Sequence, residues 1–366
     1  MTLNRVARLR IRNRSTNHQM GPELPIHRQS IGPPTAHRFN FFAVWLDKGD
    51  VVGASVSGAG KRVSGYDPRL REVHGSVVDT SQWLAPASPL PQGGTAGTDH
   101  VADEAGWYAV AMQGDGGAYQ LTIGVYRPAL EGAGRQQTIF LDFDGATLDT
   151  SIFPFPGGVE PGPRALSPLR SFLAGWGLTD ADESAVIDAT IASVEENLLA
   201  DVVARGGNPR YSLRIVGGTI AESGIPTIGI SQYIDAGNME TEDSALVLLD
   251  RLSAPAPIAA SVNTYLGPGS DRVRFVGRTL ATLISHEMGH MFGNFHTEPF
   301  NSTVTLSDQG GNRTGLYGVG ADGFGGTPDY VDVDFGEDVL VANEGWSGLQ
   351  DSLSTIAFSV TSAPRS

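Results

Sequence analysis

Residues 280–298 read LATLISHEMGHMFGNFHTE, and the spacing of the polar residues in this stretch predicts a metal-binding helix. His286 and His290 are four residues apart, so on one helix they lie one above the other and can share one metal ion. A second face about 150° away at 100° per residue is apolar and suited to burial, and it consists of Leu280, Ile284, Met288 and Met291. The histidine face is therefore free to line a cleft.

Three further residues complete the pattern. Glu287 is one position along the helix, where it cannot easily join the same coordination shell but can reach a water held by the metal, as a general base would. Gly293 tolerates the positive φ that a sharp helix end requires, and three residues later His296 can return to the metal as a third ligand. Because the chain has no cysteine, a transition metal must be held by His, Asp or Glu, and zinc suits this set.

The string His286-Glu287-x-x-His290-x-x-Gly293-x-x-His296 resembles the zinc signature of the metzincin metalloproteases. The resemblance implies a zinc-dependent endopeptidase in which the three histidines bind zinc and Glu287 is the general base. It also implies a protein or peptide substrate and a secreted or extracellular location.

The same resemblance implies a fold for residues 137–366. It would be an α+β catalytic domain with a twisted sheet, two long helices and a smaller, irregular C-terminal subdomain. Substrate would lie extended along an edge strand of the sheet, for which residues 244–250, SALVLLD, are the candidate.

One part of the family pattern is missing. Metzincins carry a methionine in a tight turn beneath the zinc, and no methionine follows His296 in this chain. The nearest match is VTLSDQGG at 304–311, in which Ser307 would occupy the place of the methionine. Since that methionine packs under the metal without binding it, the departure affects the stability of the site more than its chemistry.

Residues 37–128 read as a separate all-β domain. The stretch from Gly106, GWYAVAMQGDGGAYQLTIGVYRP, predicts a hairpin that turns at residues 114–117. With HRFNFFAVWLD and VVGASVSG before it, the region is predicted to form a β-sandwich. Together with SPLPQGG at 88–94, it resembles the bacterial pre-peptidase C-terminal domain, an accessory module of secreted proteases. The expected fold class is thus multidomain, with an N-terminal all-β sandwich before the metzincin-like domain.

Two segments flank this domain. Residues 1–36 begin with an arginine-rich stretch that lacks acids, and its arginines interrupt any apolar core of a secretory signal, so we expect a disordered basic tail. Residues 129–136 are small and polar without a period and are predicted to be a linker.

Four elements are expected ahead of the metal-binding helix. Residues 183–204 carry apolar side chains at helical spacing behind the capping candidates Thr179 and Asp180, which predicts a long helix. Strands are expected at 211–218 and 226–234, besides the candidate edge strand.

Net charge excludes some partners. At −15, the chain lacks the basic face that nucleic acid or an anionic membrane surface requires. No apolar run approaches the roughly 20 residues that span a bilayer. We therefore expect no nucleic acid and no membrane as partner, and the sequence leaves the oligomeric state open.

Residues 139–145, IFLDFDG, permit a different enzyme. Asp-x-Asp-Gly after a strand resembles the nucleophile loop of haloacid-dehalogenase-type phosphatases, with Asp142 as the nucleophile. The phosphatase loop requires a small hydroxyl residue directly after the glycine, and the enzyme requires a distant lysine that neutralises the phosphoryl group. Here Ala146 follows the glycine, and no lysine occurs after Lys61. The segment is better interpreted as the first strand of the second domain.

Two other site residues have weaker claims. Some zinc proteases use a downstream glutamate as third ligand, and Glu344 in NEGWSG is a candidate for that role. However, such a glutamate normally lies on a helix, whereas the neighbours of Glu344 are poor helix formers, and the spacing of His296 suits a third ligand better. Tyr317 could assist an oxyanion, but its position in the sequence does not decide this.

A glycine- and aspartate-rich stretch, residues 320–338, suits calcium, although a solvated acidic loop explains it equally well. The candidate ligands are Asp322, Asp329, Asp332, Asp334 and Asp338. A last alternative is a catalytically inactive zinc-binding protein that attaches to matrix or polymer; the intact Glu287 argues against it, and the missing methionine argues for it.

Overall fold

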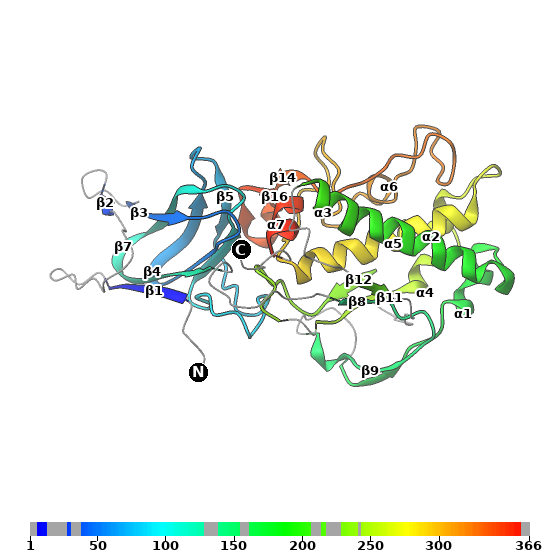
Figure 1. Ribbon diagram of the computed structural model, residues 1–366, viewed down its shortest axis with the longest axis horizontal. Coiled ribbons are helices and arrows are strands. Elements are labelled where there is room, and N and C mark those ends of the chain that lie inside the picture. Colours follow the sequence, from blue (N-terminus) through cyan, green and yellow to red (C-terminus); the bar gives the residue numbers. More distant parts are fainter. Residues whose placement is uncertain are drawn as a thin grey trace.

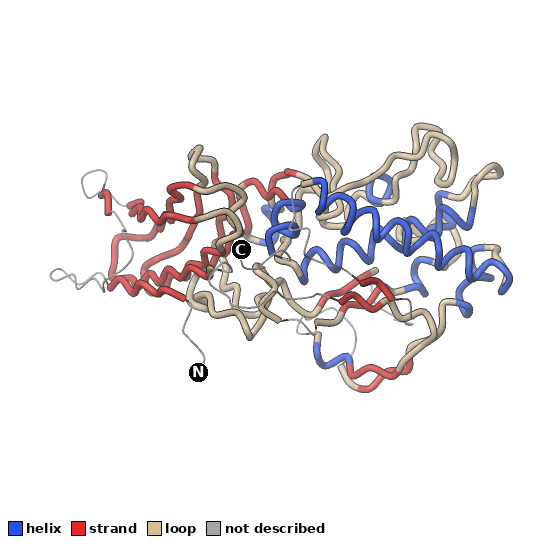
Figure 2. The backbone as a smooth tube through the Cα atoms, viewed as in Figure 1, coloured by secondary structure: helices blue, strands red, loops and turns tan. Residues whose placement is uncertain are grey.

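A computed structural model describes residues 6–12, 28–30, 38–127, 138–153, 161–205, 214–216, 228–240 and 243–359. The chain forms an N-terminal antiparallel β region followed by a mixed α/β region that contains the helices (Figure 1, Figure 2). The general multidomain layout expected from the sequence is therefore present. The predicted linker at 129–136 lies outside the described residues.

The β region is one eight-stranded antiparallel sheet in the order β15-β5-β4-β7-β3-β2, with β1 also paired to β7 and β6 to β4. Seven strands come from the N-terminal third of the chain: β1 (Val6–Arg12), β2 (Arg28–Ser30), β3 (Arg38–Leu46), β4 (Val51–Tyr66), β5 (Glu72–Ser76), β6 (Ala96–Val101) and β7 (Gly106–Tyr126). The eighth, β15 (Trp346–Ser347), comes from near the C-terminus and pairs with β5.

The two long strands organise this sheet. The first part of β7 pairs with β3 and its last part with β1, whereas β4 pairs with β6 at its start and with β5 at its end. Alternate side chains of these strands are buried in one apolar cluster, which includes Phe42, Val44, Leu46, Val110, Leu121 and Ile123.

The hairpin predicted from Gly106 is wrong, because β7 runs without a turn from Gly106 to Tyr126. A Cβ on Gly114 would lie 2.2 Å from the carbonyl oxygen of Ala59 in β4, and the β4–β7 register shifts between Gly58 and Arg62. The glycine therefore permits a close approach of two strands at an irregularity, a use that the sequence cannot distinguish from a turn.

The expected disordered tail also needs correction, since residues 6–12 and 28–30 form strands. The first of these, VARLRIR, alternates arginine with Ala7, Leu9 and Ile11, which is the period of a β-strand. This strand extends the sheet by pairing with β7 from Val6 to Arg12.

The α/β region begins with a small sheet and a helical layer. Its elements up to the metal-binding helix are β8 (Thr138–Phe140), β9 (Thr147–Asp149), η2 (Thr150–Ile152), β10 (Pro163–Ala165), α1 (Arg170–Leu173), η3 (Ala174–Trp176), η4 (Asp180–Asp182), α2 (Glu183–Glu195), η5 (Glu196–Ala200), α3 (Asp201–Ala204), β11 (Arg214–Val216), β12 (Gly229–Ser231), β13 (Ala245–Val247), α4 (Leu249–Leu252) and η6 (Val262–Tyr265).

The helix predicted at 183–204 is present but interrupted. It begins behind a capping box in which the backbone N–H of Thr179 donates to the Asp182 carboxylate at 2.8 Å, and Thr179 is one of the two capping candidates. Residues 196–200 form a π-helical turn before α3 continues the helix. Figure 1 shows α2 lying alongside α5, and Asn197 of the π turn donates to the Ser285 hydroxyl of α5 at 3.0 Å.

Strands β11, β12 and β13 form within segments predicted to be strands, and β8 overlaps the start of the fourth such segment, residues 139–145. β8 pairs with β11 in parallel, and β12 pairs with β13 antiparallel. β13 ends at Val247, after which the last residues of the candidate edge segment 244–250 begin the short helix α4. β12 and β13 form a two-stranded pair, and β13 also lines a cavity that β8 borders. The use of residues 244–250 as an edge strand for substrate stays a prediction.

The chain after α5 contains little regular structure. Its elements are α6 (Arg313–Leu316), β14 (Glu337–Val339), η7 (Ala342–Glu344), β15, β16 (Leu349–Asp351) and α7 (Ser352–Ser359). Within the ranges that the structure describes, no helix is long and apolar enough to cross a membrane.

Candidate metal centre

The predicted metal-binding helix is α5, which spans Arg272–Met291. Its N-cap Asp271 accepts a hydrogen bond from the backbone N–H of Arg274, and its C-cap is Phe292. Gly293 follows with a φ of 104°, and a Cβ there would lie 2.6 Å from the Cα of Ala236. Glycine thus allows both the left-handed turn and the close approach of the neighbouring chain.

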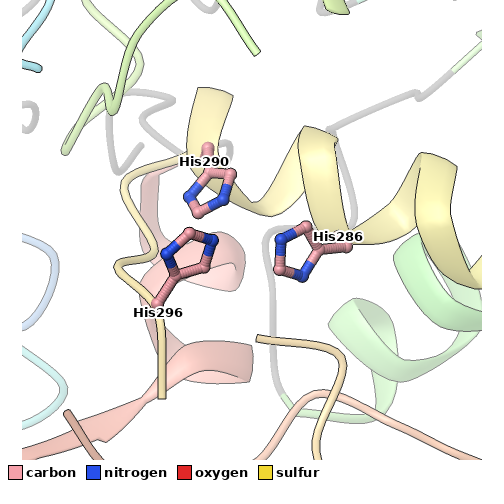
Figure 3. A group of neighbouring side chains, drawn as sticks. All are labelled: His286, His290 and His296. Atoms are coloured by element: carbon pink, nitrogen blue, oxygen red, sulfur yellow. The ribbon is translucent and has the colours of Figure 1, made fainter. Parts of the chain in front are cut away.

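This turn brings three histidines together. His286 and His290 extend from α5, and His296 points back at them from the segment after Gly293 (Figure 3). One ring nitrogen from each lies within 4.8 Å of the others, and the ring centroids are 4.7 to 5.2 Å apart. Among the described residues, no fourth His, Cys, Asp or Glu joins this group, and a site with three protein ligands leaves its fourth position to a water or a substrate.

Each of the three rings is held by a hydrogen bond at Nδ1. The acceptor is the Leu306 carbonyl for His286 at 2.6 Å, the Asn294 carbonyl for His290 at 2.7 Å, and the Glu344 carboxylate for His296 at 2.9 Å. An acceptor at Nδ1 fixes the tautomer in which Nε2 carries a free lone pair. The donor set therefore fits zinc: three imidazoles oriented by outer hydrogen bonds.

Burial keeps two of these rings neutral. It lowers the pKa of His286 well below its usual value, and the positive charges that His290 and His296 would carry lower it further. Burial also lowers the pKa of His290 to about 3, with His296 adding to the effect. Since only the neutral imidazole binds a metal ion, both rings are in the required form at neutral pH.

Glu287 lies next to His286 on α5 and is buried, and burial raises the pKa of its carboxyl to about 8. Strand β12 crosses the helix here, and a Cβ on Gly229 would lie 2.2 Å from the Glu287 carboxylate. Because Gly229 has no Cβ, the Glu287 carboxylate can occupy this space. Glu287 also lines the cavity of about 430 Å³ between β8, β13 and the apolar face of α5, which includes Ile284, Met288 and Met291.

Residues 305–308 form a turn that contacts one of the candidate ligands. The N–H of Asp308 donates to the carbonyl of Thr305 at 3.1 Å, and the carbonyl of Leu306, inside this turn, is the acceptor for His286. Ser307 is buried in the same turn, and its carbonyl accepts from the N–H of Thr297. The replacement of the methionine by Ser307 stays a prediction, and the contact with the ligand set is made by the Leu306 backbone.

Two further candidates from the sequence, Tyr317 and Asp142, make hydrogen bonds elsewhere in the chain. Tyr317 is buried and donates its hydroxyl to the Ala260 carbonyl at 2.9 Å, so that hydroxyl is engaged in the core. The Asp142 carboxylate accepts from the N–H of Asp144 at 3.0 Å, directly after β8. Among the described residues that line the adjoining cavity there is no lysine or arginine to neutralise a phosphoryl group.

The predicted calcium ligands do not form one group. Asp322 and Asp329 are joined within one loop, because the N–H of Asp322 donates to Asp329 and Thr327 donates to both carboxylates. Asp332 accepts from the Tyr330 hydroxyl at 3.2 Å, and Asp338 accepts from Asn301 at 2.7 Å. Calcium binding at the five candidate aspartates stays a prediction that this arrangement does not favour.

Asp334 instead approaches Glu196 and Asp201, which the sequence reasoning did not associate with it. Burial and the neighbouring acids raise the pKa of Glu196 to about 7. Exposed acidic groups of this kind are common without an ion. The cluster alone therefore does not indicate a metal site.

The sequence reasoning also missed three outer partners of the histidines. The carbonyls of Leu306 and Asn294 have no side-chain signal that could reveal them. Glu344 was considered as a rival third ligand, whereas the structure places it behind His296 at Nδ1.

Comparison with known proteins gives no relative: no family model, curated protein or solved structure matches the chain. The interpretation of the site therefore rests on its own residues and geometry.

Proposed function

We propose that this protein is a zinc-dependent endopeptidase with a metzincin-like catalytic domain. The observation that carries the proposal is the convergence of His286, His290 and His296, each held at Nδ1. Glu287 follows His286 on the same helix. Three nitrogen ligands that leave the fourth position to water are typical of catalytic zinc, whereas structural zinc sites are closed by four protein ligands.

Zinc, when bound by the three histidines, supplies a Lewis acid that polarises the scissile carbonyl and lowers the pKa of water. Glu287 takes the proton of the attacking water and passes it to the leaving amine. Strand β13, which lines the same cavity as Glu287, is the candidate surface for an extended peptide. The resemblance to secreted proteases favours an extracellular substrate.

The variant Glu287→Gln tests this function. We expect one zinc per chain in wild type and variant, and casein cleavage that falls at least about 100-fold in the variant, because removal of a general base typically costs that much or more. Glu337→Gln, the same change at a half-exposed position of β14, is the matched control and should cleave at the wild-type rate.

Three results would contradict the proposal. Equal cleavage by Glu287→Gln would remove the role of the carboxylate. Zinc binding without cleavage by the wild type would favour the inactive zinc-binding protein, to which the missing methionine points. A wild-type chain without zinc would overturn the metal centre and return attention to Asp142.

A further inference from the structure

The Glu344 carboxylate accepts hydrogen bonds from His296 and from two other side chains. It accepts from His296 Nδ1 at 2.9 Å, from the Gln309 amide at 2.5 Å and from the Trp346 indole N–H at 3.3 Å. A carboxylate is thus fixed behind the third ligand by hydrogen bonds from three side chains.

His296 depends on such a partner more than the other two histidines do. His286 and His290 belong to one helix, and the acceptors at their Nδ1 atoms are backbone carbonyls. His296 lies outside regular structure, its side chain is 29% exposed, and a side chain is its acceptor. The orientation of its imidazole is therefore set by where Glu344 lies.

The position of Glu344 is in turn set by the β region. Gly345 follows it with a φ of 89°, and its carbonyl accepts from the N–H of Val77 at 3.1 Å. The next residues, Trp346 and Ser347, form β15, the edge strand of the N-terminal sheet, in register with Ser76 and Gly75 of β5.

Side chains of the β region hold the same strand. Arg62 of β4 donates to the Ser347 hydroxyl at 2.7 Å, and that hydroxyl donates to Glu72 of β5 at 2.5 Å. The Trp346 ring packs edge-on against Trp83 at 5.2 Å and Phe295 at 4.9 Å between centroids. The ring centroid of His74 in β5 lies 4.3 Å from that of Phe295. Phe295 is the residue directly before His296.

We propose that Glu344 is a positioning residue for His296, and that the N-terminal β region is part of the metal centre because it holds Glu344 through β15. This inference rests on the metal centre of the proposed function and not on peptide cleavage. The β region would thus act as a structural support of the zinc site, in addition to any accessory role in substrate attachment.

The first test measures zinc affinity by competition with a chromophoric chelator, on the full chain. Glu344→Gln keeps an acceptor but loses the charge, and Glu344→Ala loses both, so we expect zinc to bind about 10-fold and 100-fold more weakly, respectively. The visible spectrum of the cobalt-substituted protein should change in both variants. Glu337→Gln, which removes the charge from the contact of Arg71 with β14 elsewhere between the two regions, should leave affinity and spectrum unchanged.

The second test addresses the β region. Val77→Pro removes the backbone N–H that Val77 gives to Gly345, and Val77→Ala removes the exposed side chain but keeps the N–H. We expect zinc affinity to fall at least 3-fold in Val77→Pro and to stay at the wild-type value in Val77→Ala.

The outcomes separate the two proposals. Wild-type zinc affinity in both Glu344 variants, with unchanged cobalt spectra, would overturn the positioning role and leave the proposed peptidase intact. Equal zinc affinity in the two Val77 variants would overturn the role of the β region. A wild-type chain that binds no zinc would overturn the metal centre and this inference with it.

Discussion

At the scale of single residues, the molecule keeps several ionisable groups in apolar surroundings, and those of the metal centre are only some of them. Asp99 of β6 and His74 of β5 are both buried, and the His74 Nδ1 contacts the carbonyl of Asp99 at 2.5 Å. Burial raises the pKa of Asp99 to about 7 and lowers the pKa of His74 to about 4. Both groups are therefore held neutral at a cost to stability.

The substitution Asp99→Asn tests that cost. The pKa of Asp99 is higher in the folded chain than its unperturbed value of 3.8, so the folded state binds the proton more tightly and the wild type loses stability as pH rises from about 4 to about 7. Asparagine does not ionise. We expect the free energy of unfolding of the variant, relative to wild type, to increase by about 1 kcal/mol or more between pH 5 and pH 8.

Denaturant unfolding at the two pH values checks this. Asp115→Asn, at a side chain that is 69% exposed, controls for the removal of one negative charge. A difference between wild type and Asp99→Asn that does not change with pH would show that Asp99 is not a strained buried acid.

At this scale the sequence predicts the candidate ligands but not the groups that hold them in place. His286, Glu287 and His290 could be predicted because helical spacing is a local property of four or five residues. The contact of His296 with Glu344 joins residues 48 positions apart, and nothing local in the sequence indicates it. Backbone acceptors such as the Leu306 carbonyl leave no sequence signal at all.

At the scale of elements, the end of α5 is the feature that creates the site. The helix could be predicted closely, because its apolar face and its Gly293 turn are both local signals. The long strand β7 could not, because strand pairing is decided by partners far away in the sequence.

The helix end gives an element-scale prediction. In Gly293→Ala, alanine must adopt a positive φ that L-residues rarely adopt, and its Cβ would lie 2.6 Å from the Ala236 Cα. The helix end must therefore move. We expect a loss of about 2–4 kcal/mol in unfolding free energy, from the positive φ and the overpacking together, with weakened zinc binding.

Gly323→Ala is the matched control, because Gly323 has a φ of 79° and a Cβ there meets nothing within 4 Å. It should lose only the strain of the positive φ, about 1 kcal/mol. Equal losses in the two variants, measured by denaturant unfolding, would show that the contact with Ala236 does not constrain the helix end.

At the scale of the whole molecule, the two regions share a sheet. The sequence predicts a β domain followed by a catalytic domain with a linker between them, and the order of the regions is present. The sequence does not indicate that β15, from near the C-terminus, would add to the N-terminal sheet, since a strand of two residues has no detectable period. An apolar cluster joins the regions at this point, formed by Leu84, Ile234, Phe295, Leu340, Val341 and Trp346.

The central claim, that three histidines form a zinc centre, is tested most directly by zinc X-ray absorption on the purified full chain with its metal content measured. The account predicts one zinc per chain and a first shell with three histidine nitrogens at about 2.0–2.1 Å, completed by oxygen. In His296→Ala the number of histidine nitrogens should fall to two. Absence of zinc, or a first shell without the three histidines, would contradict the account.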